Sequence, residues 1–224
     1  MNKLSLYVLL ILLFLGLSKS FSLSSQQTVF VPNINVLPSL KNGAPISLIL
    51  VDMYDAGFLI KTYYLKFKVI HGFKSAETLV VRTHVKFWEE NKNNIGMSLF
   101  RRHERDEKES TVPLPPGSIF IGNQAFGSWK YHDSGKKIWQ FHKVYRHFPK
   151  SFNWQEFRPS YDFYQSLKVH EENSTAFYGL ANEFGTAGTV TEKMSMGSLS
   201  KRTKETISIY NYFTTYFKLP KWTK

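Results

Sequence analysis

The sequence of 224 residues contains no cysteine. Without a thiol the chain cannot form disulfide bonds, thiolate metal sites, a cysteine nucleophile or a lipid anchor on cysteine. Glycine and proline are also few, at 13 and 9 residues, which excludes a collagen-like or low-complexity chain. Acidic residues are in deficit, because 17 Asp+Glu oppose 29 Lys+Arg and leave a formal net charge of +12. This excess of positive charge favours an anionic partner.

Aromatic residues, by contrast, are abundant. They make up 16% of the chain, and hydrophobic residues make up 42%. A disordered chain would be poor in aromatics, so this composition predicts a folded globular protein. Because there is no internal repeat and no linker, we expect one β-rich domain over residues 46–217. An irregular lead-in over residues 21–45 would precede it, and a basic tail over residues 218–224 would follow.

The first 20 residues have the composition of a secretory signal peptide. Lys3 provides a basic start, residues 4–17 are almost wholly apolar, and small residues follow at Ser18, Ser20 and Ser22. Fourteen apolar residues fall short of the roughly 20 that a membrane-spanning helix needs. We therefore expect cleavage and export. Export without cysteine favours a bacterial periplasm or outer surface, because secreted domains in oxidising compartments commonly recruit disulfides.

Hydrophobic alternation predicts a mainly β fold, an antiparallel β-sandwich or open barrel with one or two short helices, α+β by strict labels. A hairpin is expected where Asp133, Ser134 and Gly135 connect two alternating segments. Residues 161–169 fit a strand or a short helix, and residues 101–109 are expected to form a solvated charged surface. The expected strands lie near residues 28–31, 46–51, 58–70, 79–87, 118–122, 128–132, 136–142 and 207–217.

An aromatic and basic band is the first candidate site. Twelve aromatic residues fall between positions 129 and 164, and six Lys/Arg between 130 and 150 face one acid, Asp133. Planar rings beside cations can stack on sugars and hold phosphates or carboxylates. Alternatively, most of these rings fill the core while the cations extend to solvent. The candidate ligand-binding residues are Trp129, Tyr131, Lys136, Lys137, Trp139, Tyr145, Arg146, Trp154 and Arg158.

Histidines and carboxylates in the same region form the second candidate site. They suggest acid–base chemistry in a hydrolase of glycan or ester bonds. The sequence has no His-x-His pair in this region and no His-Glu-x-x-His helix, so we expect no metal ion, and no cofactor is expected either. The Gly-x-Ser-x-Gly motif of many serine hydrolases is also missing. The candidate catalytic residues are His132, His142, His147, Glu156 and Glu183.

Two further segments have compositions that bear on ligand binding. The glycine-spaced residues 178–188, which include Asn182 and Glu183, fit a structural loop better than a ligand cradle. Residues 193–224 carry seven Lys/Arg against Glu205, which suits an anionic surface.

These observations predict an exported binding protein of the bacterial envelope. Its aromatic and basic groove would hold an anionic or carbohydrate-bearing component, such as lipid head groups, lipopolysaccharide or cell-wall glycan. Peripheral membrane contact fits this expectation, whereas nucleic acid does not, because export places the protein away from it. The alternatives are an envelope hydrolase and a structural subunit that docks onto another envelope protein.

Overall fold

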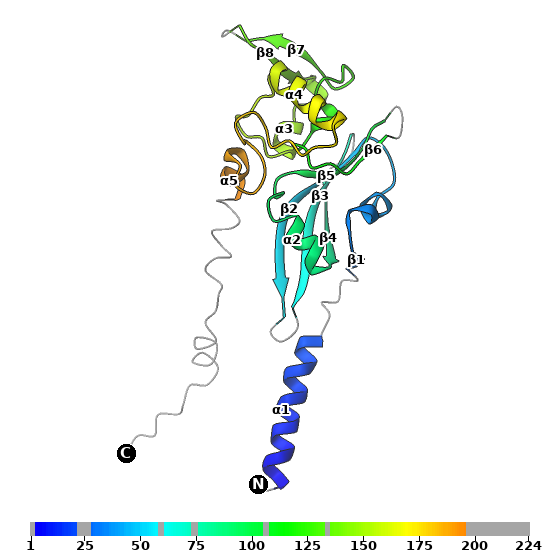
Figure 1. Ribbon diagram of the computed structural model, residues 1–224, viewed down its shortest axis with the longest axis vertical. Coiled ribbons are helices and arrows are strands. Elements are labelled where there is room, and N and C mark those ends of the chain that lie inside the picture. Colours follow the sequence, from blue (N-terminus) through cyan, green and yellow to red (C-terminus); the bar gives the residue numbers. More distant parts are fainter. Residues whose placement is uncertain are drawn as a thin grey trace, which may run out of the picture.

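A computed structural model describes residues 3–21, 28–57, 61–72, 76–104, 108–132 and 135–195 (Figure 1). The helices are α1 (Lys3–Phe21), η1 (Ile34–Leu40), α2 (Val85–Glu90), η2 (Ser118–Phe120), η3 (Lys143–Tyr145), α3 (Phe148–Ser151), α4 (Tyr161–Glu172) and α5 (Thr189–Ser195), where η marks a 3-10 helix. The strands are β1 (Val29–Val31), β2 (Ile46–Ala56), β3 (Thr62–His71), β4 (Glu77–Thr83), β5 (Ser98–Arg102), β6 (Glu109–Ser110), β7 (Gly127–Tyr131) and β8 (Lys137–Phe141).

Six strands form one curled sheet in the order β1-β4-β3-β2-β5-β6. Its long strands alternate as the sequence predicts: Leu65, Phe67 and Val69 of β3 are fully buried, whereas Lys66 and Lys68 between them are half-buried. β1 pairs with β4 in parallel, and every other pairing in the sheet is antiparallel. The β-rich α+β class is confirmed, with a sheet that is mixed because of this one short strand.

The β7–β8 hairpin forms the second sheet and lies at the far end of the molecule from α1 (Figure 1). Its register pairs Trp129 with Trp139, so the predicted hairpin is confirmed. The chain that leads into α4 runs along β8: Trp139 N donates to Pro159 O over 2.8 Å, and Ile138 is bridged to Ser160. Pro159 and Ser160 therefore extend the hairpin on its β8 side.

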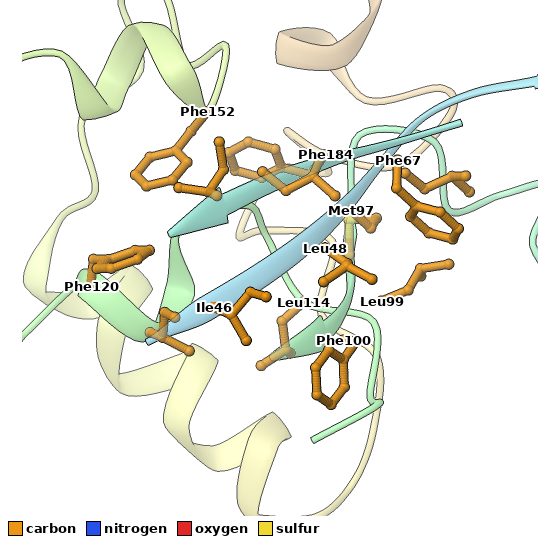
Figure 2. Packing of buried hydrophobic residues seen from close by; sticks show 14 of the residues in the cluster. Ile46, Leu48, Phe67, Met97, Leu99, Phe100, Leu114, Phe120, Phe152 and Phe184 are labelled. Carbon is orange, nitrogen blue, oxygen red and sulfur yellow. The ribbon is translucent and has the colours of Figure 1, made fainter. Parts of the chain in front are cut away.

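One hydrophobic core joins the sheet to the segments above it. Figure 2 shows Leu48 and Phe67 of the sheet in the same cluster as Phe120, Phe152 and Phe184 from the later segments. Phe120 is a centre of ring packing, with its ring centroid 4.9 Å from that of Phe126 and 4.7 Å from that of Phe148. Shared burial holds the two parts together.

The α1 helix stands apart from this core (Figure 1). Its apolar side chains from Leu4 to Leu15 are exposed. Among the described residues, no helix is long and apolar enough to cross a membrane.

Three expected elements differ from the structure. The strand expected over residues 79–87 ends at Thr83, because His84 caps α2 by accepting a hydrogen bond from Lys86 N. The strand expected over residues 118–122 is instead the buried 3-10 helix η2, which follows the left-handed Gly117. Residues 101–109 were expected to form a solvated surface, but Arg101 of β5 is fully buried.

The ambiguous segment at residues 161–169 is helical. Ser160 caps α4 by accepting a hydrogen bond from Phe163 N over 3.1 Å, and Phe163 and Leu167 bury the same face at i,i+4 spacing. The strand expected over residues 207–217 and the basic tail at 218–224 lie outside the described residues.

Candidate functional site

An open cavity of about 530 Å³ lies beside the loop that follows α3. Among the described residues that line it, four are cationic and none is acidic. We call this cavity the basic pocket. It is lined by Arg146, Pro149, Lys150, Asn153, Gln155, Arg158 and Lys193.

Burial of Trp154 shapes this loop. The Trp154 side chain is only 1% exposed, and its Nε1 donates to Pro116 O over 2.9 Å. The residues on either side, Asn153 and Gln155, have left-handed φ values of 60° and 52° and line the pocket. Left-handed conformations cost energy for residues other than glycine, and they gather at binding sites where the surrounding structure enforces them. Here the anchored tryptophan is what enforces them.

Arg158 is held at the pocket by its own loop. One of its guanidinium nitrogens, Nη1, donates to Gln155 O and to Phe157 O, each over 2.8 Å. Because these bonds fix the orientation of an exposed side chain, less conformational entropy would be lost when the guanidinium pairs with an anion.

Lys193 reaches the pocket from α5. This short helix is positioned by Thr191, which is buried against Gly96 of the turn before β5. A hydrogen bond of 2.9 Å from Val190 N to Glu183 O also ties α5 to the preceding loop. The pocket therefore joins residues that are distant in the sequence.

A second feature lies on the hairpin. Tyr131 and Tyr161 are 74% and 40% exposed, and Lys137 Nζ lies 5.2 Å from the ring centroid of Tyr131 and 5.7 Å from that of Tyr161. Trp129 packs edge-on against Tyr161 with 5.1 Å between centroids, and its centroid is 5.5 Å from that of Tyr164. We call these five residues the aromatic ledge. It combines exposed ring surface with a cation.

The predicted ligand-binding residues divide between these two features and the core. Arg146 and Arg158 line the basic pocket, whereas Trp129, Tyr131 and Lys137 belong to the aromatic ledge. Two of the others are buried. Trp139 and Trp154 are 2% and 1% exposed, so their rings serve as core and have no face open to a ligand.

The other two predicted ligand-binding residues lie elsewhere. Tyr145 is half-buried, with its ring centroid 5.0 Å from that of Phe126. Lys136 is exposed beside the hairpin turn, where its carbonyl accepts a hydrogen bond from His132 N.

The predicted catalytic residues are not assembled. His142 is exposed, and its Nε2 lies 3.0 Å from Gln124 O. His147 and Glu156 are exposed as well, and the Glu183 carboxylate accepts a hydrogen bond from Ala181 N. In the described part of the chain, no hydrogen bond or ion pair joins any two of these four.

The remaining candidate, His132, is exposed at the end of the hairpin. No group of three or more metal-ligating side chains occurs among the described residues. Among the described residues, the hydrogen bonds of His142 and Glu183 go to Gln124 O and Ala181 N and join no histidine to a carboxylate.

Sequence reasoning missed a smaller cavity of about 220 Å³ between α4 and the segment of η2 at residues 118–123. It is lined in part by His103, Ser118 and Glu171. Glu171 Oε1 lies 3.7 Å from both His103 Nε2 and Arg101 Nη2. No periodicity connects a charged segment near residue 103 with the end of a helix near residue 171, so nothing in the sequence pattern indicated this contact.

Burial and charge compete at this carboxylate. Burial raises the pKa of Glu171, but the hydrogen bond from His103 and the charges of Arg101, His103 and Lys108 outweigh it and leave the pKa below its usual value. Burial lowers the pKa of Arg101 to about 10, so the guanidinium is still charged at neutral pH. The contact is thus an ion pair that links the sheet to α4.

The chain matches no protein-family model, no curated protein and no solved structure, so its own geometry and charge carry the functional conclusion.

Proposed function

We propose that this is an exported binding protein that holds an anionic group in the basic pocket. The observation that supports this function is the cavity of about 530 Å³, where four cations and no acid are found among the described lining residues. Its volume is within the range of about 300–1,000 Å³ that is usual for small-molecule sites.

The chemistry of the lining residues fits phosphate, sulfate or carboxylate groups. Two of the cations, Arg146 and Arg158, carry guanidinium groups, which can bind such anions through two parallel hydrogen bonds. Lys150 and Lys193 add two ammonium groups, which attract any anion without a preferred direction. The net positive charge of the chain would also speed the approach of an anionic ligand.

The proposal places the protein in a bacterial envelope. Support comes from α1, an apolar helix with exposed side chains that stands apart from the core, as an N-terminal signal peptide would (Figure 1). Anionic components there include lipid head groups, lipopolysaccharide and cell-wall glycan. N-terminal sequencing of the protein from an envelope fraction tests export: a start at Phe21 or Leu23 supports it, and a start at Met1 overturns it.

The binding test uses inorganic pyrophosphate as a compact anion, titrated calorimetrically into the purified protein. Neutralising two pocket cations in the double variant Lys150→Gln and Arg158→Gln should weaken binding by roughly a hundredfold or more, because charged hydrogen bonds contribute about 1.5–3 kcal/mol each. Binding should also weaken as salt concentration rises.

A matched variant separates the pocket from general charge. Lys86 of α2 and Lys130 of β7 are exposed and do not line the pocket, so the double variant Lys86→Gln and Lys130→Gln removes the same two charges elsewhere. Equal losses in the pocket variant and this control variant would mean that only net charge matters. That result, or no binding by the unaltered protein, would overturn the proposed function.

A further inference from the structure

We propose that the ligand is an acidic oligosaccharide, which places an anionic group in the basic pocket and a neighbouring sugar ring on the aromatic ledge. The inference rests on the proposed function and adds to it a second subsite and a chemical class of ligand.

The pocket and the ledge are joined by one short segment. Arg158 lines the pocket, and Tyr161 belongs to the ledge three residues later. Since an extended chain advances at most about 3.6 Å per residue, their Cα atoms are no more than about 11 Å apart. An oligosaccharide can span this separation, whereas a single small anion cannot occupy both places.

The segment between them is held firmly. Pro159 O accepts the hydrogen bond from Trp139 N, and Ser160 both bridges to Ile138 and caps α4. The spacing between the two subsites is therefore set before a ligand arrives, which reduces the entropic cost of binding both.

The ledge has the chemistry of a surface for sugar rings that carry negative charge. Tyr131 and Tyr161 provide exposed ring surface with polar hydroxyls, which suits the mixed apolar and polar faces of a sugar. Lys137 lies over both rings and can pair with a carboxylate or sulfate.

One ledge ring, Tyr161, is held by packing on its neighbours. Trp129 packs edge-on against Tyr161 and against the buried Trp139, with 5.1 Å between centroids in both pairs. Rigid aromatic side chains lose little freedom on binding, so contact with them favours affinity.

The experiment compares short oligogalacturonates, galacturonic acid monomer and pyrophosphate on the purified protein. The oligomer should bind more tightly than the monomer. Tyr131→Ala should weaken oligomer binding by roughly fivefold, because a stacking or cation–π contact contributes about 1 kcal/mol, and should leave pyrophosphate binding unchanged. Val144→Ala removes a side chain that is 75% exposed and lies outside the ledge, and it should change neither.

The possible results separate the two proposals. Pyrophosphate binding with no oligomer binding, or oligomer binding that Tyr131→Ala does not weaken, would overturn this inference and leave the anion site standing. A neutral oligosaccharide that binds as well as the acidic one would also overturn it.

Two further results bear on the same question. If neither ligand binds, both proposals fail. If Tyr131→Ala weakens binding only to phosphatidylglycerol vesicles, the ledge contacts lipid, and the oligosaccharide inference is wrong.

Discussion

Arg101 Nη2 and Glu171 Oε1 lie 3.7 Å apart and connect β5 of the six-stranded sheet to the last turn of α4. The guanidinium is fully buried and also donates to Ser98 O, Val112 O and Ser110 Oγ over 3.0, 2.7 and 2.8 Å. A buried charge with this many partners holds its neighbours in one arrangement.

Glu171→Gln should destabilise the fold by about 1–2 kcal/mol, because the buried guanidinium of Arg101 loses its only ion-pair partner among the described residues. The partly exposed carboxylate and the other hydrogen bonds of Arg101 keep the loss below that of a fully buried pair. Urea unfolding measures it. Glu172→Gln is the control at an exposed neighbour, and an equal loss in both variants would contradict the assignment.

The same contact should make stability depend on pH in the acid range. The pKa of Glu171 in the folded protein is below its ordinary value of 4.5, so the folded state favours the charged form. This contribution is fully present above about pH 4.5 and is lost as the pH falls through the folded pKa. The free energy of unfolding, measured at a series of pH values from 6 downward, should fall more steeply for the unaltered protein than for Glu171→Gln. Parallel curves would contradict this.

Gly96→Ala should weaken both the fold and anion binding. Gly96 has a φ of +85°, and an added Cβ would meet the side chain of the buried Thr191. We expect a loss of about 1–3 kcal/mol and a displaced α5, which carries Lys193 to the basic pocket. Pyrophosphate titration and urea unfolding measure the two effects.

Gly135 provides the control for that prediction. It has a similar φ of +76°, but an added Cβ there would meet nothing within 4 Å. Gly135→Ala should therefore show only backbone strain and unchanged pyrophosphate affinity. An unchanged affinity for Gly96→Ala as well would mean that Lys193 does not contribute to the pocket.

Trp139→Ala should cost about 3–5 kcal/mol of stability, because it empties a large volume in the core. Tyr131→Ala on the adjacent strand should change stability by only about 0.5 kcal/mol or less, since that side chain is 74% exposed. Thermal unfolding of both variants compares a core ring with a ledge ring. Similar melting temperatures for the two variants would contradict the assignment of Trp139 to the core and of Tyr131 to the aromatic ledge.

The sequence predicted the parts of the fold that depend on local pattern. The β7–β8 hairpin followed from a short turn between two alternating segments, and β3 followed from alternation of apolar residues with lysines. The prediction of a strand over residues 118–122 was wrong, because residues 118–120 form a 3-10 helix. A short apolar stretch has no periodicity that distinguishes a strand from such a helix.

The candidate site was predictable only in part. Local density of aromatic and basic residues indicated Arg146, Arg158 and Tyr131, but it could not separate exposed rings from buried ones such as Trp154. Lys193 was missed as a pocket residue because α5 reaches the site through long-range packing on Gly96. Three-dimensional contacts of this kind leave no trace in sequence spacing.

Within the described part of the chain, the six-stranded sheet ends on both sides in very short strands, β1 with three residues and β6 with two. The backbone of β5 is further occupied beside β6, where Ser98 N donates to Leu114 O over 2.8 Å. An unpaired strand edge is a template on which a second chain can add and aggregate. Because β6 and Leu114 cover the outer edge of β5, the fold should protect a cysteine-free, aromatic-rich protein from self-association at the concentrations that purification requires.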